Sequence, residues 1–212
     1  MLLAFDTATP YVTVALHDGE DVVAERRSEQ RMRHGEQLAP LIEEVMGDVG
    51  IVRQDLTAIA VGVGPGPFTG LRVGLVTART LAFVLEIPVY GVCSLDVVAL
   101  EAAQDAPVGG KLTVPTDARR KEVYLATYDD QGRRLGDPDV VRPHDAATEG
   151  PVAGEGALLY PEAFPDARDP LLPSAGWLAR AVVAELAELH DPEPMYLRRP
   201  DAVAPGAPKR VS

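Results

Sequence analysis

The 212-residue sequence predicts an α/β protein with two lobes, in which mixed β-sheets are flanked by helices. Two observations lead to this fold class. Short apolar or alternating runs joined by tight turns occur twice, over residues 2–25 and again over residues 112–135, and such runs are typical of antiparallel strand meanders. After the first meander, short buried strands alternate with longer segments of helical period.

The first half contains eight predicted elements. Asp18-Gly19 is a hairpin signal between the second and third strands, the second of which alternates as a half-buried strand does. Gly47 and Gly50 end the first helix, and Ser94 is a suitable N-cap for the third. We expect strands over residues 2–5, 12–17, 22–25, 57–63 and 88–92, and helices over 35–46, 69–85 and 94–103.

The second half is less regular, and the polar, Gly- and Pro-containing stretch 104–110 separates it from the first. We expect strands over residues 112–115, 122–128 and 133–135, weaker strands at 152–153 and 158–159, and a helix over 175–190. The expected organisation is an N-terminal lobe over residues 1–104, a smaller C-terminal lobe over 105–199 and an extended tail over 200–212.

Composition narrows the possible functions. The net charge of −12 argues against direct, unaided binding of nucleic acid, which depends on neutralising phosphates with Lys and Arg. Cys93 is the single cysteine, so the sequence predicts neither a disulfide framework nor a cysteine-based zinc site. No segment suggests a membrane span, and we expect a cytoplasmic protein.

Residues 62–74, GVGPGPFTGLRVG, lie between a buried strand and a long helix, as phosphate-binding loops do. The segment has no lysine, and Pro65 and Pro67 each remove a backbone N–H that a phosphate cradle would need. The loop is therefore predicted to be a stiff lead-in to the helix rather than an anion cradle.

The four histidines offer no metal-ligand pair. The segment His34-Gly35-Glu36-Gln37-Leu38 resembles the start of a metallopeptidase motif, but Leu38 stands where the second histidine would be required. We predict no metal site.

Arg72 lies in the first turn of the helix over residues 69–85, where the helix dipole disfavours a cation. An anionic partner would offset this cost. Asp6 of the same chain and a carboxylate of another protein are the two candidates, and an arginine exposed to solvent is the alternative.

The same helix carries Gly70, Gly74, Ala78 and Ala82 at every fourth position and is apolar on nearly every side. One side can face the sheet, and the other needs a cover. We hypothesise that this helix and the preceding one dock onto a like pair of helices elsewhere. The predicted interface residues are Leu38, Leu41, Ile42, Val45, Gly70, Leu71, Arg72, Gly74, Leu75, Ala78 and Ala82.

Residues 64–74, GPGPFTGLRVG, resemble the GPGSFTGLRIG signature of the TsaB (YeaZ) family, with Pro67 where serine is usual. The resemblance covers residues 1–130 well, is thin over 131–190 and returns at Tyr196. Supporting segments stand in the expected order at residues 6–8, 34–41, 91–95, 117–124 and 194–198.

The resemblance implies a two-lobed actin-like ATPase fold, which is ribonuclease H-like. It also implies a non-catalytic accessory subunit of the bacterial complex that transfers a threonylcarbamoyl group to a tRNA adenosine next to the anticodon. The implied partners are a TsaD-like catalytic subunit, a TsaE-like ATPase and, indirectly, tRNA. No cofactor of its own is implied; ATP and a metal would be held by other subunits. The metal-binding histidines of the catalytic relative correspond to positions near Ser94 and Val98, which are not a ligand pair.

Two other functions remain open. A nucleotide-dependent kinase or ATPase of the actin-like fold would use Asp6 and Thr7 as its first phosphate turn, but it also needs a second glycine-rich loop, and residues 113–120 contain no glycine. A metal-dependent peptidase would need the missing histidines. A homodimer through the helices proposed for docking also remains open.

Overall fold

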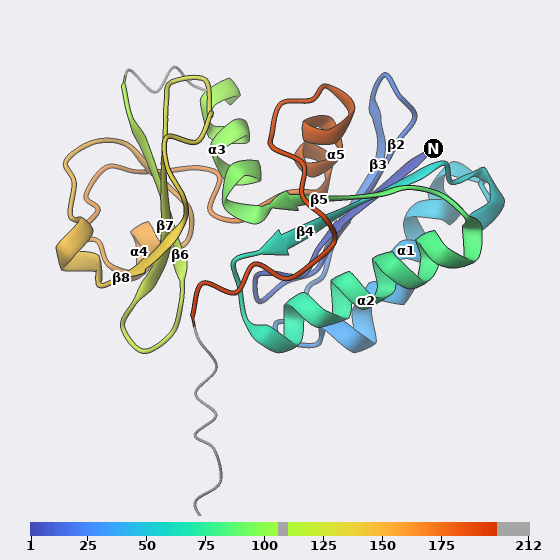
Figure 1. Ribbon diagram of the computed structural model, residues 1–212, viewed down its shortest axis with the longest axis horizontal. Coiled ribbons are helices and arrows are strands. Elements are labelled where there is room, and N and C mark those ends of the chain that lie inside the picture. Colours follow the sequence, from blue (N-terminus) through green and yellow to red (C-terminus); the bar gives the residue numbers. More distant parts are fainter. Residues whose placement is uncertain (106–109, 199–212) are drawn as a thin grey trace, which may run out of the picture.

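The computed structural model describes residues 1–105 and 110–198, and within them two five-stranded sheets carry the helices (Figure 1). The first sheet consists of β1 (Leu2–Asp6), β2 (Thr13–His17), β3 (Val22–Arg27), β4 (Ala58–Gly64) and β5 (Val89–Cys93). The second consists of β6 (Leu112–Asp117), β7 (Val123–Tyr128), β8 (Asp139–Val141), β9 (Val152–Ala153) and β10 (Ala167–Arg168). The helices are α1 (His34–Val49), α2 (Phe68–Leu85), α3 (Ser94–Asp105), α4 (Gly156–Leu159) and α5 (Ala175–Val183), with short 3-10 turns at Arg53–Asp55 and Pro143–Ala146.

The two sheets share one topology. The first has the order β3-β2-β1-β4-β5, and the second, followed from β8, has the order β8-β7-β6-β9-β10. In each, the first three strands along the chain pair antiparallel, and the fourth and fifth continue parallel to the first. The predicted α/β class with two mixed sheets is confirmed, and the repeated sheet agrees with the two-lobed actin-like fold that the resemblance implies.

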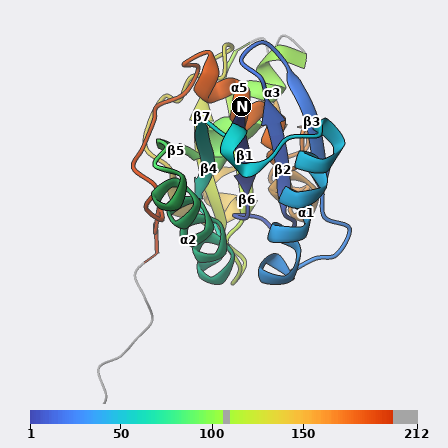
Figure 2. The same ribbon diagram turned by 90° about the vertical axis from the view of Figure 1, so that its right-hand side faces the viewer.

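The first sheet is covered on both faces. Along β1, Leu3 and Phe5 pack under α1 and α2, whereas Leu2 and Ala4 face α5, as the two-residue period of a strand requires. Figure 2 shows α1 and α2 side by side on the same face. The expectation of a half-buried strand over residues 12–17 is wrong, because α5 covers the second face and all five residues of β2 are buried.

α3 lies between the two sheets (Figure 1). Val97 and Leu100 belong to the cluster on the first sheet, while Val98 and Ala102 pack with Leu112 of β6. α3 is therefore buried on almost every side, whereas α2 is not.

Two expectations for the second half are corrected. The third strand of the second meander is β8, not residues 133–135, where Arg134 forms only a single bridge with Tyr128. Leu158 and Leu159 belong to α4 rather than to a strand, and both are exposed at its outer side.

The predicted helix over residues 175–190 ends early, at Val183. The chain then turns through Glu185, with φ of 52°, and crosses back to the edge of β5, where Gly91 and His190 exchange backbone hydrogen bonds of 2.9 and 2.8 Å. α5 and the segment after it thus lie on the first sheet, although they follow the second sheet in sequence. The lobe boundaries expected at residues 104 and 199 stay a prediction, and the expected tail, 200–212, lies outside the described residues.

Candidate functional site

The Gly/Pro loop of residues 64–67 lies directly on the turn that follows β1. A Cβ atom at Gly66 would lie 2.3 Å from the carbonyl oxygen of Ala8. The loop therefore fits only without a side chain at this position, and it packs against the turn that an actin-like kinase would use for phosphate. This close packing supports the prediction of a stiff lead-in to α2.

Asp6 and Thr7, the nucleotide candidates, both bond within the chain. Asp6 is 1 % exposed; one of its carboxylate oxygens accepts the Ala8 N–H at 2.6 Å, and the other accepts the Ser94 hydroxyl at 2.6 Å. Burial raises the pKa of Asp6 above its usual range. The Thr7 hydroxyl donates to the carbonyl of Gly70 at 2.8 Å. These bonds join the β1 turn to α2 and to the start of α3, and the Ser94 hydroxyl expected to cap α3 donates to Asp6.

Arg72 does not pair with Asp6, so that candidate is wrong. Its guanidinium carbon lies 3.6 Å from the centre of the Phe68 ring, and its Nε donates to the Tyr196 hydroxyl at 3.3 Å. Phe68 and Tyr196 stack with ring centres 5.4 Å apart. The three side chains form an exposed stack at the start of α2.

Most residues of the predicted interface face inward. The apolar pattern along α1 and α2 marks the sides that pack on the first sheet, and there a Cβ at Gly70 would lie 2.5 Å from the carbonyl of Thr7. Arg72 is exposed, and the other predicted interface residues are buried within the chain: Leu38, Leu41, Ile42, Val45, Gly70, Leu71, Gly74, Leu75, Ala78 and Ala82.

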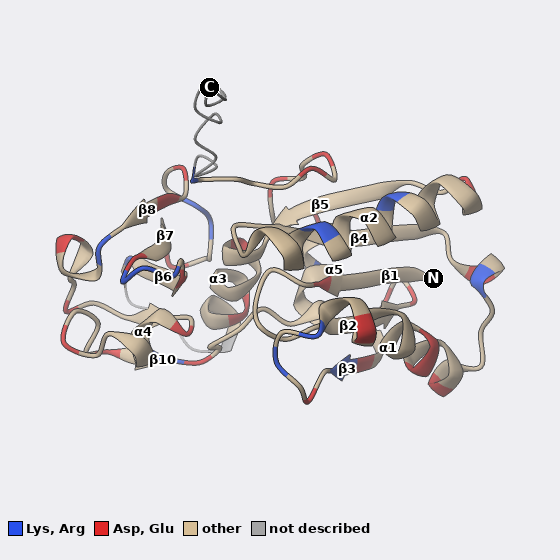
Figure 3. Cartoon of the chain, turned by 90° about the horizontal axis from the view of Figure 1, so that it is seen from below, with Lys and Arg blue, Asp and Glu red and all other residues tan. Residues whose placement is uncertain are grey.

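The outward side of α2 carries a different set of apolar residues. Phe68, Val76, Phe83 and Val84 are 50, 62, 85 and 69 % exposed, and we call them the α2 stripe. The only charges in the helix are Arg72 and Arg79 (Figure 3). α2 therefore has an apolar side that the rest of the chain does not cover, as its sequence indicated. That side consists of the α2 stripe and not of the predicted interface residues.

By length and composition α2 could cross a membrane, with 18 residues of mean hydropathy 1.4, which corrects the expectation that no segment suggests a span. Its inward side, from Leu71 to Ala82, packs in the core on the first sheet. A core helix of a globular fold passes the same test, so this property alone points to no membrane.

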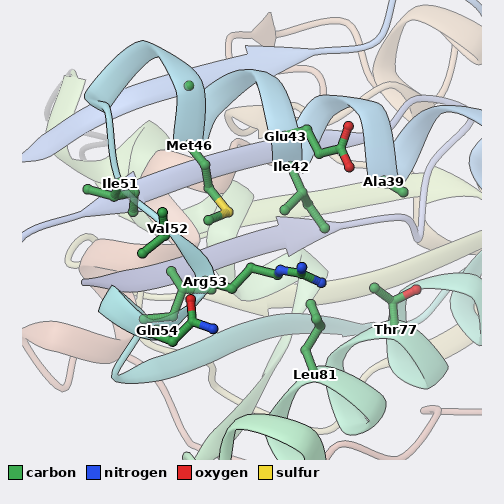
Figure 4. A pocket seen from close by; sticks show the side chains of 12 residues that line it. Ala39, Ile42, Glu43, Met46, Ile51, Val52, Arg53, Gln54, Thr77 and Leu81 are labelled. Carbon is green, nitrogen blue, oxygen red and sulfur yellow. The ribbon is translucent and has the colours of Figure 1, made fainter.

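A groove of about 560 Å³ runs between α1 and α2 (Figure 4). Ile42 and Met46 line it from α1, Thr77 and Leu81 from α2, and Arg53 reaches into it from the connection to β4. The groove is therefore lined mainly by apolar side chains, with Glu43, Arg53 and Gln54 among the polar ones.

His34, which begins the peptidase-like segment, is buried, and its Nε2 lies 2.7 Å from the carbonyl oxygen of Thr9. Among residues 1–105 and 110–198, no group of three or more His, Cys, Asp or Glu side chains is arranged to hold a metal ion. His34 thus joins the start of α1 to the turn between β1 and β2.

An ionic cluster beside α3 was not predicted from the sequence. The Tyr128 hydroxyl donates to Asp96 at 2.8 Å, and Arg134 bridges Asp96 at 3.2 Å and Glu188 at 2.7 Å. Burial raises the pKa of Asp96. The cluster ties α3, the second meander and the returning C-terminal segment together, and its members are too far apart in sequence for any spacing rule to unite them.

Comparison with known proteins identifies the family. The family model described as tRNA N6-adenosine threonylcarbamoyltransferase (TsaD) matches residues 21–160. The chain is 31% identical over 219 residues to a protein of Escherichia coli named tRNA threonylcarbamoyladenosine biosynthesis protein TsaB, and the match covers 93% of this chain and 94% of that one. The chain belongs to the TsaB family.

Three further proteins are similar to this chain over more than nine tenths of its length. An uncharacterized protein of Mycobacterium tuberculosis is 41% identical over 205 residues, covering 95% of this chain and 93% of that one. The solved structure of YeaZ from Pseudomonas aeruginosa superposes with a TM-score of 0.74 at 30% identity, covering 92% of this chain and 99% of that one. A second structure from that organism, described as similar to the peptidase YEAZ, reaches a TM-score of 0.78 at 31% identity and covers 93% and 99%. The resemblance carried by residues 64–74 is confirmed.

Proposed function

We propose that this chain is a non-catalytic accessory subunit in the biosynthesis of threonylcarbamoyladenosine in tRNA, and that it docks through the outer side of α2 onto a TsaD-like catalytic subunit. Membership of the TsaB family supports the pathway. The observation that carries the docking role is the α2 stripe, four large apolar side chains that are each at least half exposed.

The α2 stripe is suited to a partner protein rather than to solvent. Large apolar side chains gathered on one exposed helix face mark interaction surfaces, and aromatic and arginine residues such as Phe83 and Arg72 are the usual energetic anchors of an interface. The groove beside Ile42 and Leu81 can receive side chains of a helix that packs against this surface. The same surface would serve a second copy of this chain, so a homodimer would compete with the heterodimer.

The chemistry is assigned to the partners. Ser94 and Val98 lie near the positions of the histidine pair in the catalytic relative. The Ser94 hydroxyl donates to Asp6, and Val98 packs in the core. Asp6 and Thr7 are committed to bonds within the chain. We therefore assign the metal to the TsaD-like subunit and ATP hydrolysis to a TsaE-like ATPase, both acting in the cytoplasm. The net charge of −12 favours the partner for the main tRNA contact.

The test is reconstitution of the tRNA modification from purified TsaD-like and TsaE-like proteins with and without this chain. We expect modification to depend on the chain.

Replacing Val76 or Phe83 by Asp should lower binding to the TsaD-like subunit by about 30-fold or more, because a charge would be buried in an apolar interface. Leu158→Asp, at a similarly exposed apolar position on α4, is the matched control and should bind normally.

Equal modification without this chain would overturn the accessory role. If the α2 variants bound as tightly as Leu158→Asp, the docking face would lie elsewhere on the molecule. Thermal unfolding of each variant separates lost binding from lost folding.

A further inference from the structure

The strongest unexplained feature is the stack of Phe68, Arg72 and Tyr196 at the start of α2. Phe68 and Tyr196 stack with ring planes 22° apart. The Arg72 guanidinium lies over the Phe68 ring, and its Nε donates a hydrogen bond to the Tyr196 hydroxyl. Phe68 is 50 % and Tyr196 42 % exposed. A long, flexible side chain is thus held in one place at the surface.

Tyr196 reaches the stack because residues 190–198, which we call the strap, are fastened at several points. The Met195 N–H donates to the carbonyl of Val63 at 2.9 Å, and its side chain packs against the cores of both sheets. Arg198 donates to the carbonyl of Ala118 at 3.1 Å and pairs with Glu122. The strap therefore holds Tyr196 from the first sheet on one side and from the β6–β7 hairpin on the other.

Arg72 has no ion-pair partner among residues 1–105 and 110–198. Its contacts there, to Phe68 and Tyr196, use one face of the guanidinium and the Nε, which leaves the two Nη groups as a fork of donors. Such a fork matches a carboxylate or a phosphate in two parallel hydrogen bonds.

The surroundings favour a carboxylate over a nucleic-acid phosphate. Along the same side of α2, Val76 and Phe83 are 62 and 85 % exposed, so Arg72 stands at the end of an apolar surface that suits a protein. A phosphate backbone calls for several cations together, whereas α2 carries only Arg72 and Arg79 and the whole chain has a net charge of −12.

We propose that the Arg72 fork, held by Phe68 and by Tyr196 of the strap, receives a carboxylate side chain of the catalytic subunit and fixes where that subunit sits on the α2 stripe. This rests on the proposed function, because it assumes that the TsaD-like subunit docks on α2. The strap makes the site depend on the C-terminal segment as well as on α2.

The experiment measures the affinity of the full chain for the TsaD-like subunit at low and high salt. Arg72→Ala should lower the affinity by about tenfold or more and flatten its dependence on salt. Arg72→Lys should recover only part of the loss, because an ammonium group lacks the fork. Tyr196→Phe keeps the ring and removes the hydroxyl, and it should lower the affinity by about threefold. Arg142→Ala removes an equal charge from an exposed position on the second lobe and should change nothing.

The outcomes separate the two proposals. If wild type fails to bind the TsaD-like subunit, the proposed function falls and this site falls with it. If wild type binds and Arg72→Ala binds equally well with the same salt dependence, the carboxylate site alone is overturned. It is also overturned if Arg72→Ala leaves protein binding intact and weakens the binding of tRNA to the assembled complex, since the anion would then be a phosphate.

Discussion

Asp6 shows, at the scale of a single residue, how a potential catalytic group serves the fold. Its carboxylate is 1 % exposed and accepts hydrogen bonds from the Ala8 N–H and the Ser94 hydroxyl. Burial disfavours the ionised form, so the pKa of Asp6 is raised in the folded chain. Because the folded state then holds the proton more tightly than the unfolded chain, this group makes stability fall as pH rises from its usual pKa of 3.8 through the raised value.

Asp6→Asn removes this titration while its side chain can still bond Ala8 and Ser94. We expect the free energy of unfolding of the variant, relative to wild type, to increase with pH over that interval, by about 1.4 kcal/mol for each unit by which the pKa is raised. Urea denaturation of both proteins from acidic to neutral pH measures the difference. Parallel stability profiles for the two proteins would contradict a raised pKa at Asp6.

At the scale of the element, α2 is a helix with two unlike apolar sides. The inner side approaches the β1 turn so closely that a Cβ at Gly70 would lie 2.5 Å from the backbone carbonyl of Thr7. The outer side presents the α2 stripe. Of the small residues that suggested a ridge for a second helix, Gly70 and Gly74 are needed for packing on the turn at Thr7, and Ala78 and Ala82 pack in the core on the first sheet.

Gly70→Ala should destabilise the chain by about 1–3 kcal/mol, because backbone atoms must move apart, even though alanine favours a helix. Gly47→Ala is the matched control: a Cβ there meets nothing within 4 Å, and the substitution should stabilise by up to about 1 kcal/mol. Chemical denaturation measures both. Equal effects at the two positions would show that α2 does not lie this close to the β1 turn.

At the scale of the whole molecule, the strap connects the two repeated sheets. Met195 packs against the cores on both, and Arg198 reaches the hairpin of the second sheet while Tyr196 stacks on α2. α5 precedes the strap and covers the first sheet. The C-terminal part of the chain thus holds the molecule together across its two halves.

Met195→Ala should lower the free energy of unfolding by roughly 1–3 kcal/mol, because a partly buried side chain shared by two cores is lost. Leu189→Ala, at a position 41 % exposed just before the strap, should change stability by no more than about 0.5 kcal/mol. Thermal or urea unfolding compares them. A Met195 variant as stable as the Leu189 variant would remove the structural role of the strap.

The sequence by itself determined the α/β class, the position of most strands and helices in the first half and, through residues 64–74, the family. These features are local, because the hydrophobic period and the turn residues act over a few positions. A long motif can be recognised from the sequence without knowledge of the fold. The period also showed that α2 needed cover on two sides.

Only the tertiary structure decided which neighbour provides each cover. Periodicity shows which side chains avoid water but not what they meet, so the buried side of α2 was taken for the interface and β2 for a half-buried strand. Arg72 and Tyr196 are 124 residues apart. α5 packs against β1 and β2, which precede it by more than 150 residues. Such contacts depend on the path of the whole chain. The contact between Arg72 and Tyr196 therefore could not be predicted before the fold was known.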